Sequence, residues 1–143
     1  MISWNEAVNL VENTSKFKHS LFVSCIMAKM AKKLGENEFE WRIVGLLHDL
    51  DYDLVKGDMS KHGVTASRIL SGKLSEEALY AIKAHDHRAG FTPRSLLDRS
   101  LIAADALANF TEDQGIQEVE GEEALVAKLD DESILKHGSL MRY

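Results

Sequence analysis

Residues 41–51 read WRIVGLLHDLD. The apolar residues of this stretch recur at helical spacing and predict a buried helix. His48 and Asp49 stand at its end, in surroundings that are otherwise apolar. Burying an ionised carboxylate without a partner is costly, and a divalent cation held by imidazole and carboxylate is a partner of suitable chemistry. The stretch therefore predicts a core helix that ends in a metal site.

The composition of the chain is that of one small acidic domain. It has 143 residues, of which 45% are hydrophobic and 28% charged, and its formal net charge is −6. This length fits one domain over residues 1–143, and the negative charge disfavours a nucleic acid polymer as partner. No apolar run approaches the roughly 20 residues of a membrane span, the N-terminus lacks a signal-peptide pattern, and Cys25 is the single cysteine. We expect a cytoplasmic protein without a membrane partner.

Helical spacing extends over most of the chain, whereas strand signals are nearly absent. We predict an all-α fold, a single helical bundle of about six to eight helices. The expected helices lie near residues 3–11, 15–34, 37–50, 60–70, 75–85 and 93–110, with two short ones at 124–129 and 133–137. Pro93 is expected at the first position of its helix. The polar segment 51–60 is expected to be a loop, and 111–143 a C-terminal helical extension.

Metal-binding side chains interrupt otherwise apolar helix faces at four places, namely His19, His48-Asp49, His85 and Asp105. A single such histidine is most often a hydrogen-bonded core residue, but aspartate is seldom buried unless it is paired. Together they favour a shared metal, held by side chains from different helices of a bundle. Nitrogen and carboxylate oxygen donors without thiolate suit Mn, Fe, Co, Ni or Zn.

The order of these residues resembles the H…HD…D signature of the HD-domain superfamily of metal-dependent phosphohydrolases. The three matching motifs are KHSLFV at 18–23, GLLHD at 45–49 and AADAL at 103–107. The resemblance covers residues 16–110 and implies an all-α bundle. It also implies that the metal ligands are His19, His48, Asp49 and Asp105.

Two further histidines, His62 and His85, stand where the HDIG and cyclic-dinucleotide phosphodiesterase branches of this superfamily place ligands for a second metal. Leu50-Asp51 replaces the Ile-Gly of the HDIG motif, and Asp86 stands where those branches often have another histidine. The GYP signature is missing. The resemblance therefore implies one or two metal ions, and we do not assign cyclic-dinucleotide hydrolysis.

The activity implied by the resemblance is hydrolysis of a phosphomonoester or phosphodiester, with a nucleotide as the expected substrate. Metal-activated water would attack phosphorus. The residues expected to transfer protons are Asp51, His85 and Asp86. The cations expected to bind the substrate phosphate are Lys18, Lys83 and Arg88.

A second function stays open at this point. A bundle of this kind can also serve as a metal-stabilised regulatory module that senses a nucleotide without hydrolysing it. The complete set of metal ligands favours the enzyme. The segment after Gly121 is a candidate surface for a homodimer.

Overall fold

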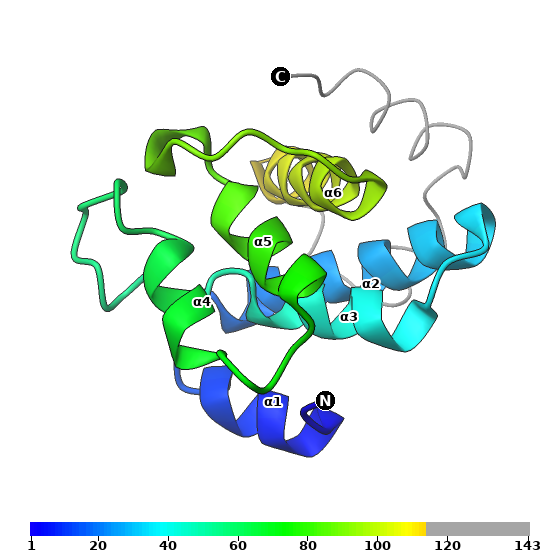
Figure 1. Cartoon of the computed structure of the whole chain (residues 1–143), viewed down its shortest axis with the longest axis horizontal. Helices are drawn as coiled ribbons and strands as arrows, with labels where there is room; N and C mark the ends of the chain where they lie inside the picture. The colour runs from blue at the N-terminus through cyan, green and yellow to red at the C-terminus, as the bar shows by residue number, and fades with distance from the viewer. Residues whose placement is uncertain (114–143) are drawn as a thin grey trace.

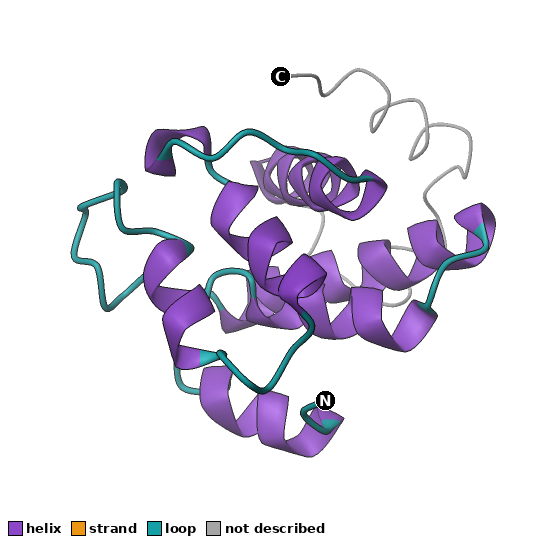
Figure 2. Cartoon of the chain, in the orientation of Figure 1, coloured by secondary structure: helices purple, strands orange, loops and turns teal. Residues whose placement is uncertain are grey.

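Helices account for all regular secondary structure in the computed structural model, which describes residues 1–113 (Figures 1 and 2). No strand occurs within these residues, so the prediction of an all-α fold is confirmed. The elements in chain order are α1 (Trp4–Val11), α2 (Phe17–Leu34), α3 (Glu38–Leu47), α4 (Val64–Ile69), α5 (Glu76–Ala84), the short 3-10 helix η1 (His87–Ala89) and α6 (Leu96–Asp113).

The helix pair α2 and α3 forms the most extensive contact of the bundle, and the two helices lie side by side in Figure 1. Gly45 lets their backbones approach closely, because a Cβ atom at this position would lie 2.8 Å from the Cα atom of Ser24. The Ser24 hydroxyl also donates to the carbonyl oxygen of Arg42 at 2.9 Å. Gly45 of the GLLHD motif is therefore needed for the packing of α3 against α2.

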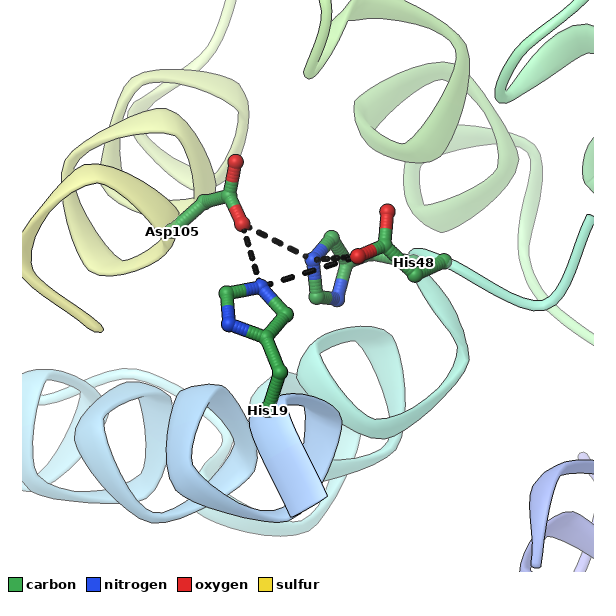
Figure 3. A group of neighbouring side chains, drawn as sticks. His19, His48 and Asp105 are labelled. Atoms are coloured by element: carbon green, nitrogen blue, oxygen red, sulfur yellow. Dashed lines mark hydrogen bonds and ion pairs between the residues drawn. The ribbon is translucent and has the colours of Figure 1, made fainter. Parts of the chain in front are cut away.

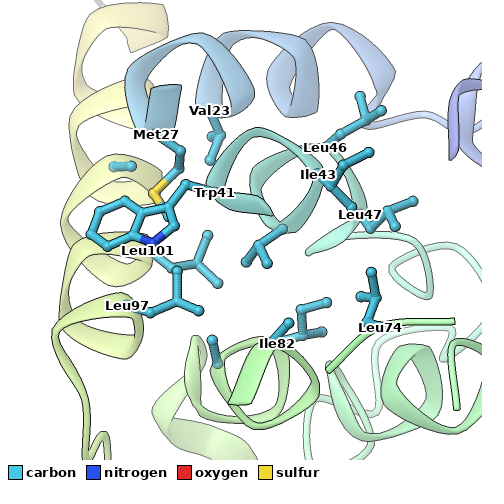
Figure 4. Close-up of a cluster of buried hydrophobic side chains, with 14 of the residues drawn as sticks. Val23, Met27, Trp41, Ile43, Leu46, Leu47, Leu74, Ile82, Leu97 and Leu101 are labelled. Carbon is cyan, nitrogen blue, oxygen red and sulfur yellow. The ribbon is translucent and has the colours of Figure 1, made fainter. Parts of the chain in front are cut away.

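The hydrophobic core lies between α2, α3, α5 and α6 (Figure 4). Met27 from α2, Trp41 from α3 and Leu101 from α6 meet at one side of it, and Ile82 approaches from α5. All four side chains are buried. Burial of each large apolar side chain contributes about 1.5–3 kcal/mol, so this core holds the ends of four helices in fixed relative positions.

Three of the helices carry side-chain caps at their starts, close to the predicted positions. The Ser3 hydroxyl accepts a hydrogen bond from the Glu6 amide at 3.1 Å, and the Glu6 side chain accepts one from the Ser3 amide. Asn37 and Ser75 cap α3 and α5 in the same way through their side-chain oxygens. These caps satisfy amides that have no partner within the helix.

Two helices, α4 and α6, begin at least three residues later than the sequence predicts. We expected Pro93 to open the sixth helix, but α6 begins at Leu96. Ser95 and Asp98 explain the difference: the Asp98 amide donates to the Ser95 hydroxyl at 3.0 Å, and the Ser95 amide donates to Asp98 at 3.2 Å. This reciprocal pair is a capping box, and it fixes the start of the helix more strongly than proline does.

The start of α4 depends on a residue from another part of the chain. A helix was expected from residue 60, but α4 begins at Val64 after Gly63. The carboxylate of Asp51 accepts the amides of Gly63 and Ala66 at 2.7 and 2.8 Å. Gly63 has a φ of +85°, and a Cβ there would lie 2.5 Å from the carbonyl oxygen of Ile82. The start of α4 is therefore held directly against α5.

The C-terminal predictions are only partly covered by the described residues. The α6 helix continues three residues past the predicted end at 110, to Asp113. The short helices expected at 124–129 and 133–137 lie outside the described residues. Among residues 1–113, no helix combines the length and the apolar character that a membrane crossing requires.

Candidate metal centre

One cluster of ligand atoms joins α2, the end of α3 and α6 (Figure 3). His19 lies in the first turn of α2, His48 directly follows α3, and Asp105 lies in the middle of α6. The Nε2 atoms of His19 and His48 lie 2.7 and 3.1 Å from the same oxygen, Oδ1 of Asp105. Figure 3 shows the three side chains pointing toward one another from their separate helices.

A second cluster consists of Asp49, His62 and His85. The Nε2 atoms of these histidines lie 3.0 and 3.3 Å from Oδ1 of Asp49, and 3.2 Å from each other. His62 precedes α4 and His85 follows α5. Both side chains are buried.

Asp49 belongs to both clusters. Its Oδ1 faces His62 and His85, whereas its Oδ2 lies 3.6 Å from Nε2 of His19 and 3.4 Å from Nε2 of His48. We call His19, His48 and Asp105 the His19 half of the centre, and His62 with His85 the His62 half. A carboxylate with one oxygen toward each half is placed to interact with a cation in each half.

The second nitrogen of each imidazole ring is occupied outside the centre. Nδ1 of His48 donates to the carbonyl oxygen of Gly45, and Nδ1 of His85 donates to that of Ile82, both at 2.7 Å. A carbonyl oxygen only accepts, so in neutral His48 and His85 the Nε2 atom carries a lone pair directed into the centre. Such outer hydrogen bonds fix the tautomer that binds metal.

Carboxylates orient the remaining two histidines. Nδ1 of His62 lies 2.7 Å from Oδ1 of Asp51, and Nδ1 of His19 lies 2.9 Å from Oε1 of Glu112. Each half of the centre therefore contains one histidine held by a backbone carbonyl and one held by a carboxylate. All four imidazoles present Nε2 to the interior of the site.

The buried charges of the centre reinforce one another. Burial by itself lowers the pKa of His62, but the carboxylates of Asp49 and Asp51 outweigh this effect and raise it to about 9. Asp49 and Asp105 also raise the pKa of His48 well above its ordinary value against the effect of burial. Burial favours neutral Asp49 and Asp105, yet the histidines lower the pKa of both carboxyl groups. The cluster thus attracts positive charge, as protons or as metal ions.

The donor set fits a divalent transition metal. Nε2 of His62 and Nε2 of His85 face each other at 3.2 Å while Nδ1 of each ring is engaged elsewhere. Two lone pairs at this distance repel each other unless a cation or a proton lies with them. Imidazole nitrogen and carboxylate oxygen without a thiolate suit the metals expected from the sequence.

Asp51 and Asp86, which were predicted to transfer protons together with His85, have their carboxylate oxygens engaged in hydrogen bonds. Asp51 is fully buried and bonds to His62 and to the amides of Gly63 and Ala66. Asp86 accepts two hydrogen bonds from the Arg88 guanidinium, at 2.9 and 2.7 Å, and one from its amide. Of the three predicted residues, the structure brings only His85 into the ligand clusters.

The predicted phosphate-binding cations lie outside the two ligand clusters. Lys18 is exposed, and the ammonium of Lys83 lies 5.0 Å from the ring centroid of Phe91 and 5.6 Å from that of Tyr80. Arg88 pairs with Asp86. Within residues 1–113, none of these three cations forms an ion pair with a carboxylate of the centre.

Sequence reasoning missed Glu112, which holds His19. It lies seven residues after Asp105 on α6, a spacing that places both side chains on the same helix face. This spacing was the available signal. Asp51 was identified from its place in the motif, but its bonds to Gly63 and Ala66 were not predicted.

Comparison with known proteins agrees with this architecture. The family model described as "HD domain" matches residues 17–109. The chain is also similar to ribonuclease Y of Acholeplasma laidlawii (strain PG-8A), with 33% identity over 98 residues. That alignment covers 64% of this chain but 17% of the ribonuclease, so the chain corresponds to a small part of its relative. No solved structure was found to match. The motif order, the helical bundle and the family match together place this chain in the HD domain family.

Proposed function

We propose that the protein is a metal-dependent phosphohydrolase that cleaves a phosphoester, with a nucleotide as substrate. The observation that carries the proposal is the position of Asp49, whose two oxygens face two separate pairs of inward-directed histidine nitrogens. This arrangement suits two divalent ions. The name of the related ribonuclease Y describes cleavage of RNA by that protein and supports a phosphodiester as the substrate class.

The residues of the centre would hold the metal in a preorganised arrangement. His19, His48, Asp49 and Asp105 would bind in one half, and His62 and His85 with Asp49 in the other. When bound, divalent metal supplies Lewis acidity toward a phosphoryl oxygen and activates water at neutral pH. Because outer hydrogen bonds already orient the imidazoles, little reorganisation is needed as charge develops in the transition state.

Asp51 acts through His62 in this proposal. Its oxygens bond to the His62 ring and to two backbone amides, so it positions the imidazole and contacts no substrate. Asp86 likewise acts through Arg88, whose guanidinium it holds at two atoms. We therefore propose positioning roles for both aspartates in place of the proton transfer expected from the sequence.

The test combines metal analysis with hydrolysis assays. The wild-type protein, His62→Ala and Asp105→Ala are loaded with Mn²⁺, freed of excess metal and analysed for metal per chain. Hydrolysis of bis(p-nitrophenyl) phosphate and p-nitrophenyl phosphate is then measured. We expect two ions per chain in the wild type, about one in each variant, and hydrolysis lost in both variants.

His87→Ala is the matched control, because this histidine is exposed and outside both ligand clusters. We expect it to keep the wild-type metal content and activity. A wild-type protein that binds no metal would contradict the proposal, and so would hydrolysis unchanged in both ligand variants. Metal and nucleotide binding without hydrolysis of any phosphoester would support the regulatory alternative instead.

A further inference from the structure

A row of three side chains leads outward from the His62 half of the centre. The ring of Tyr52 lies edge-on against that of His62, with centroids 5.6 Å apart and planes at 81°. The ammonium of Lys16 lies 4.5 Å from the centroid of the Tyr52 ring. Lys16 and Tyr52 are partly exposed, whereas His62 is buried. The row thus runs from a partly exposed cation to a metal-ligand candidate.

A tether between two segments fixes this row. Asp53, the residue after Tyr52, accepts the amide of Ser15 at 2.9 Å and also bonds to the Ser15 hydroxyl. These hydrogen bonds, with a smaller contribution from the charge of Lys16, lower the pKa of Asp53. The turn that follows the HD motif is therefore attached to the residue that precedes Lys16. Lys16 is held over Tyr52 by backbone placement as well as by its cation–π contact.

The charge of Lys16 is available to an anion. Within residues 1–113 its ammonium forms no ion pair with a carboxylate, and a cation over an aromatic ring keeps its charge. The Arg88 guanidinium, by contrast, is engaged at two atoms by the Asp86 carboxylate. Lys16 is therefore better placed to bind an anion than Arg88 is.

We propose that Lys16, positioned by Tyr52, binds oxygens of the substrate's phosphate group at the His62 side of the centre. This inference rests on the proposed function. An ammonium gives charge-assisted hydrogen bonds to phosphate oxygens, and it offsets charge on the oxygens that the metal does not contact. Tyr52 is a positioning residue in this arrangement, because its ring sets the place of the ammonium.

The test uses inorganic phosphate as the probe. Binding to the Mn²⁺-loaded protein is measured by titration calorimetry for wild type, Lys16→Met, Tyr52→Phe and Tyr52→Leu, and metal content is measured for each. We expect Lys16→Met to bind phosphate roughly 10- to 100-fold more weakly, as fits loss of a hydrogen bond to a charged group. Tyr52→Phe keeps the ring and should bind like wild type, whereas Tyr52→Leu should show an intermediate loss. Metal content should not change.

Two lysine variants on α2 make the test specific. Lys32→Met removes the same charge from the exposed last turn of the helix and should not alter phosphate binding. Lys18→Met tests the residue expected from sequence. Wild-type binding by Lys16→Met, an equal loss in Lys18→Met or Lys32→Met, or loss of metal from Lys16→Met would each overturn the assignment of Lys16. If the metal-loaded wild type binds no inorganic phosphate, this inference is wrong, whereas the proposed function is judged separately by the hydrolysis assay.

Discussion

The two halves of the metal centre use the same pairing of histidines but differ in how the carboxylate behind each pair is held. Asp51, behind His62, has no exposed surface and accepts three hydrogen bonds. Glu112, behind His19, has 25% of its side chain exposed and, among residues 1–113, bonds only to the histidine. One carboxylate is part of the interior of the bundle, and the other reaches in from the end of α6.

Only in the His62 half does the same carboxylate both stabilise the fold and orient a metal-ligand candidate. Because Asp51 accepts the amides of Gly63 and Ala66, it caps α4, which has no side-chain cap of its own. The same carboxylate orients His62. In the other half, the core positions α6 independently of Glu112. We therefore expect the two carboxylates to differ more in their effect on stability than in their effect on metal binding.

The largest effect is expected at the residue that the halves share. Asp49→Asn removes the negative charge that faces both histidine pairs, so metal content should fall in both halves and hydrolysis should fall at least ~100-fold, the upper range for outer ligand partners. Metal analysis and steady-state kinetics measure this. Asp105→Asn, which changes one half, should keep more metal than Asp49→Asn, and the reverse order would contradict the bridging position of Asp49.

The next effect concerns folding in the His62 half. Asp51→Ala leaves two buried amides without an acceptor and His62 without its partner. The free energy of unfolding should fall by roughly 2–5 kcal/mol, since each unsatisfied buried group costs about 1–3 kcal/mol. Urea unfolding measures the change. Asp58→Ala, in the exposed part of the same turn, is the control and should have little effect. Equal stability of the two variants would exclude a capping role for Asp51.

A smaller and more local effect is expected in the His19 half. Glu112→Ala should weaken metal binding about 10-fold, the lower range for a lost outer partner, with less than about 1 kcal/mol lost in stability because the pair is partly exposed. Chelator competition and urea unfolding separate the two quantities. Asp113→Ala, the exposed neighbour, should change neither. If Glu112→Ala destabilises the fold as much as Asp51→Ala, the contrast between the halves is wrong.

The last effect is a pH dependence of the metal-free protein. The pKa of His62 rises from 6.5 to about 9 on folding, so its contribution to stability is fully present below pH 6.5 and is lost as the pH rises through about 9. Unfolding in the presence of a chelator should show this decline, and His62→Gln should flatten it. Metal affinity should change in the opposite direction, because binding displaces the protons. Stability of the metal-free wild type that increases over this range would contradict the assigned charges.

Much of the fold follows from local patterns. Ser3, Asn37 and Ser75 cap helices that begin close to the predicted positions, and Gly35, in the left-handed conformation with a φ of 71°, caps the end of α2. These features depend on residues within one turn of each other, so sequence reasoning reaches them. The start of α6 is also encoded locally, by Ser95 and Asp98, although Pro93 predicts an earlier start.

The sequence alone determined the all-α class through its helical periodicity, and its resemblance to the HD-domain motifs implied His19, His48, Asp49 and Asp105 as a candidate ligand set. Only the tertiary structure placed Asp51 and Glu112 behind His62 and His19, and Lys16 over Tyr52. These contacts join residues from 11 to 93 positions apart. Such contacts depend on how the helices pack and where the turns lead, and no spacing along the chain specifies the resulting distances.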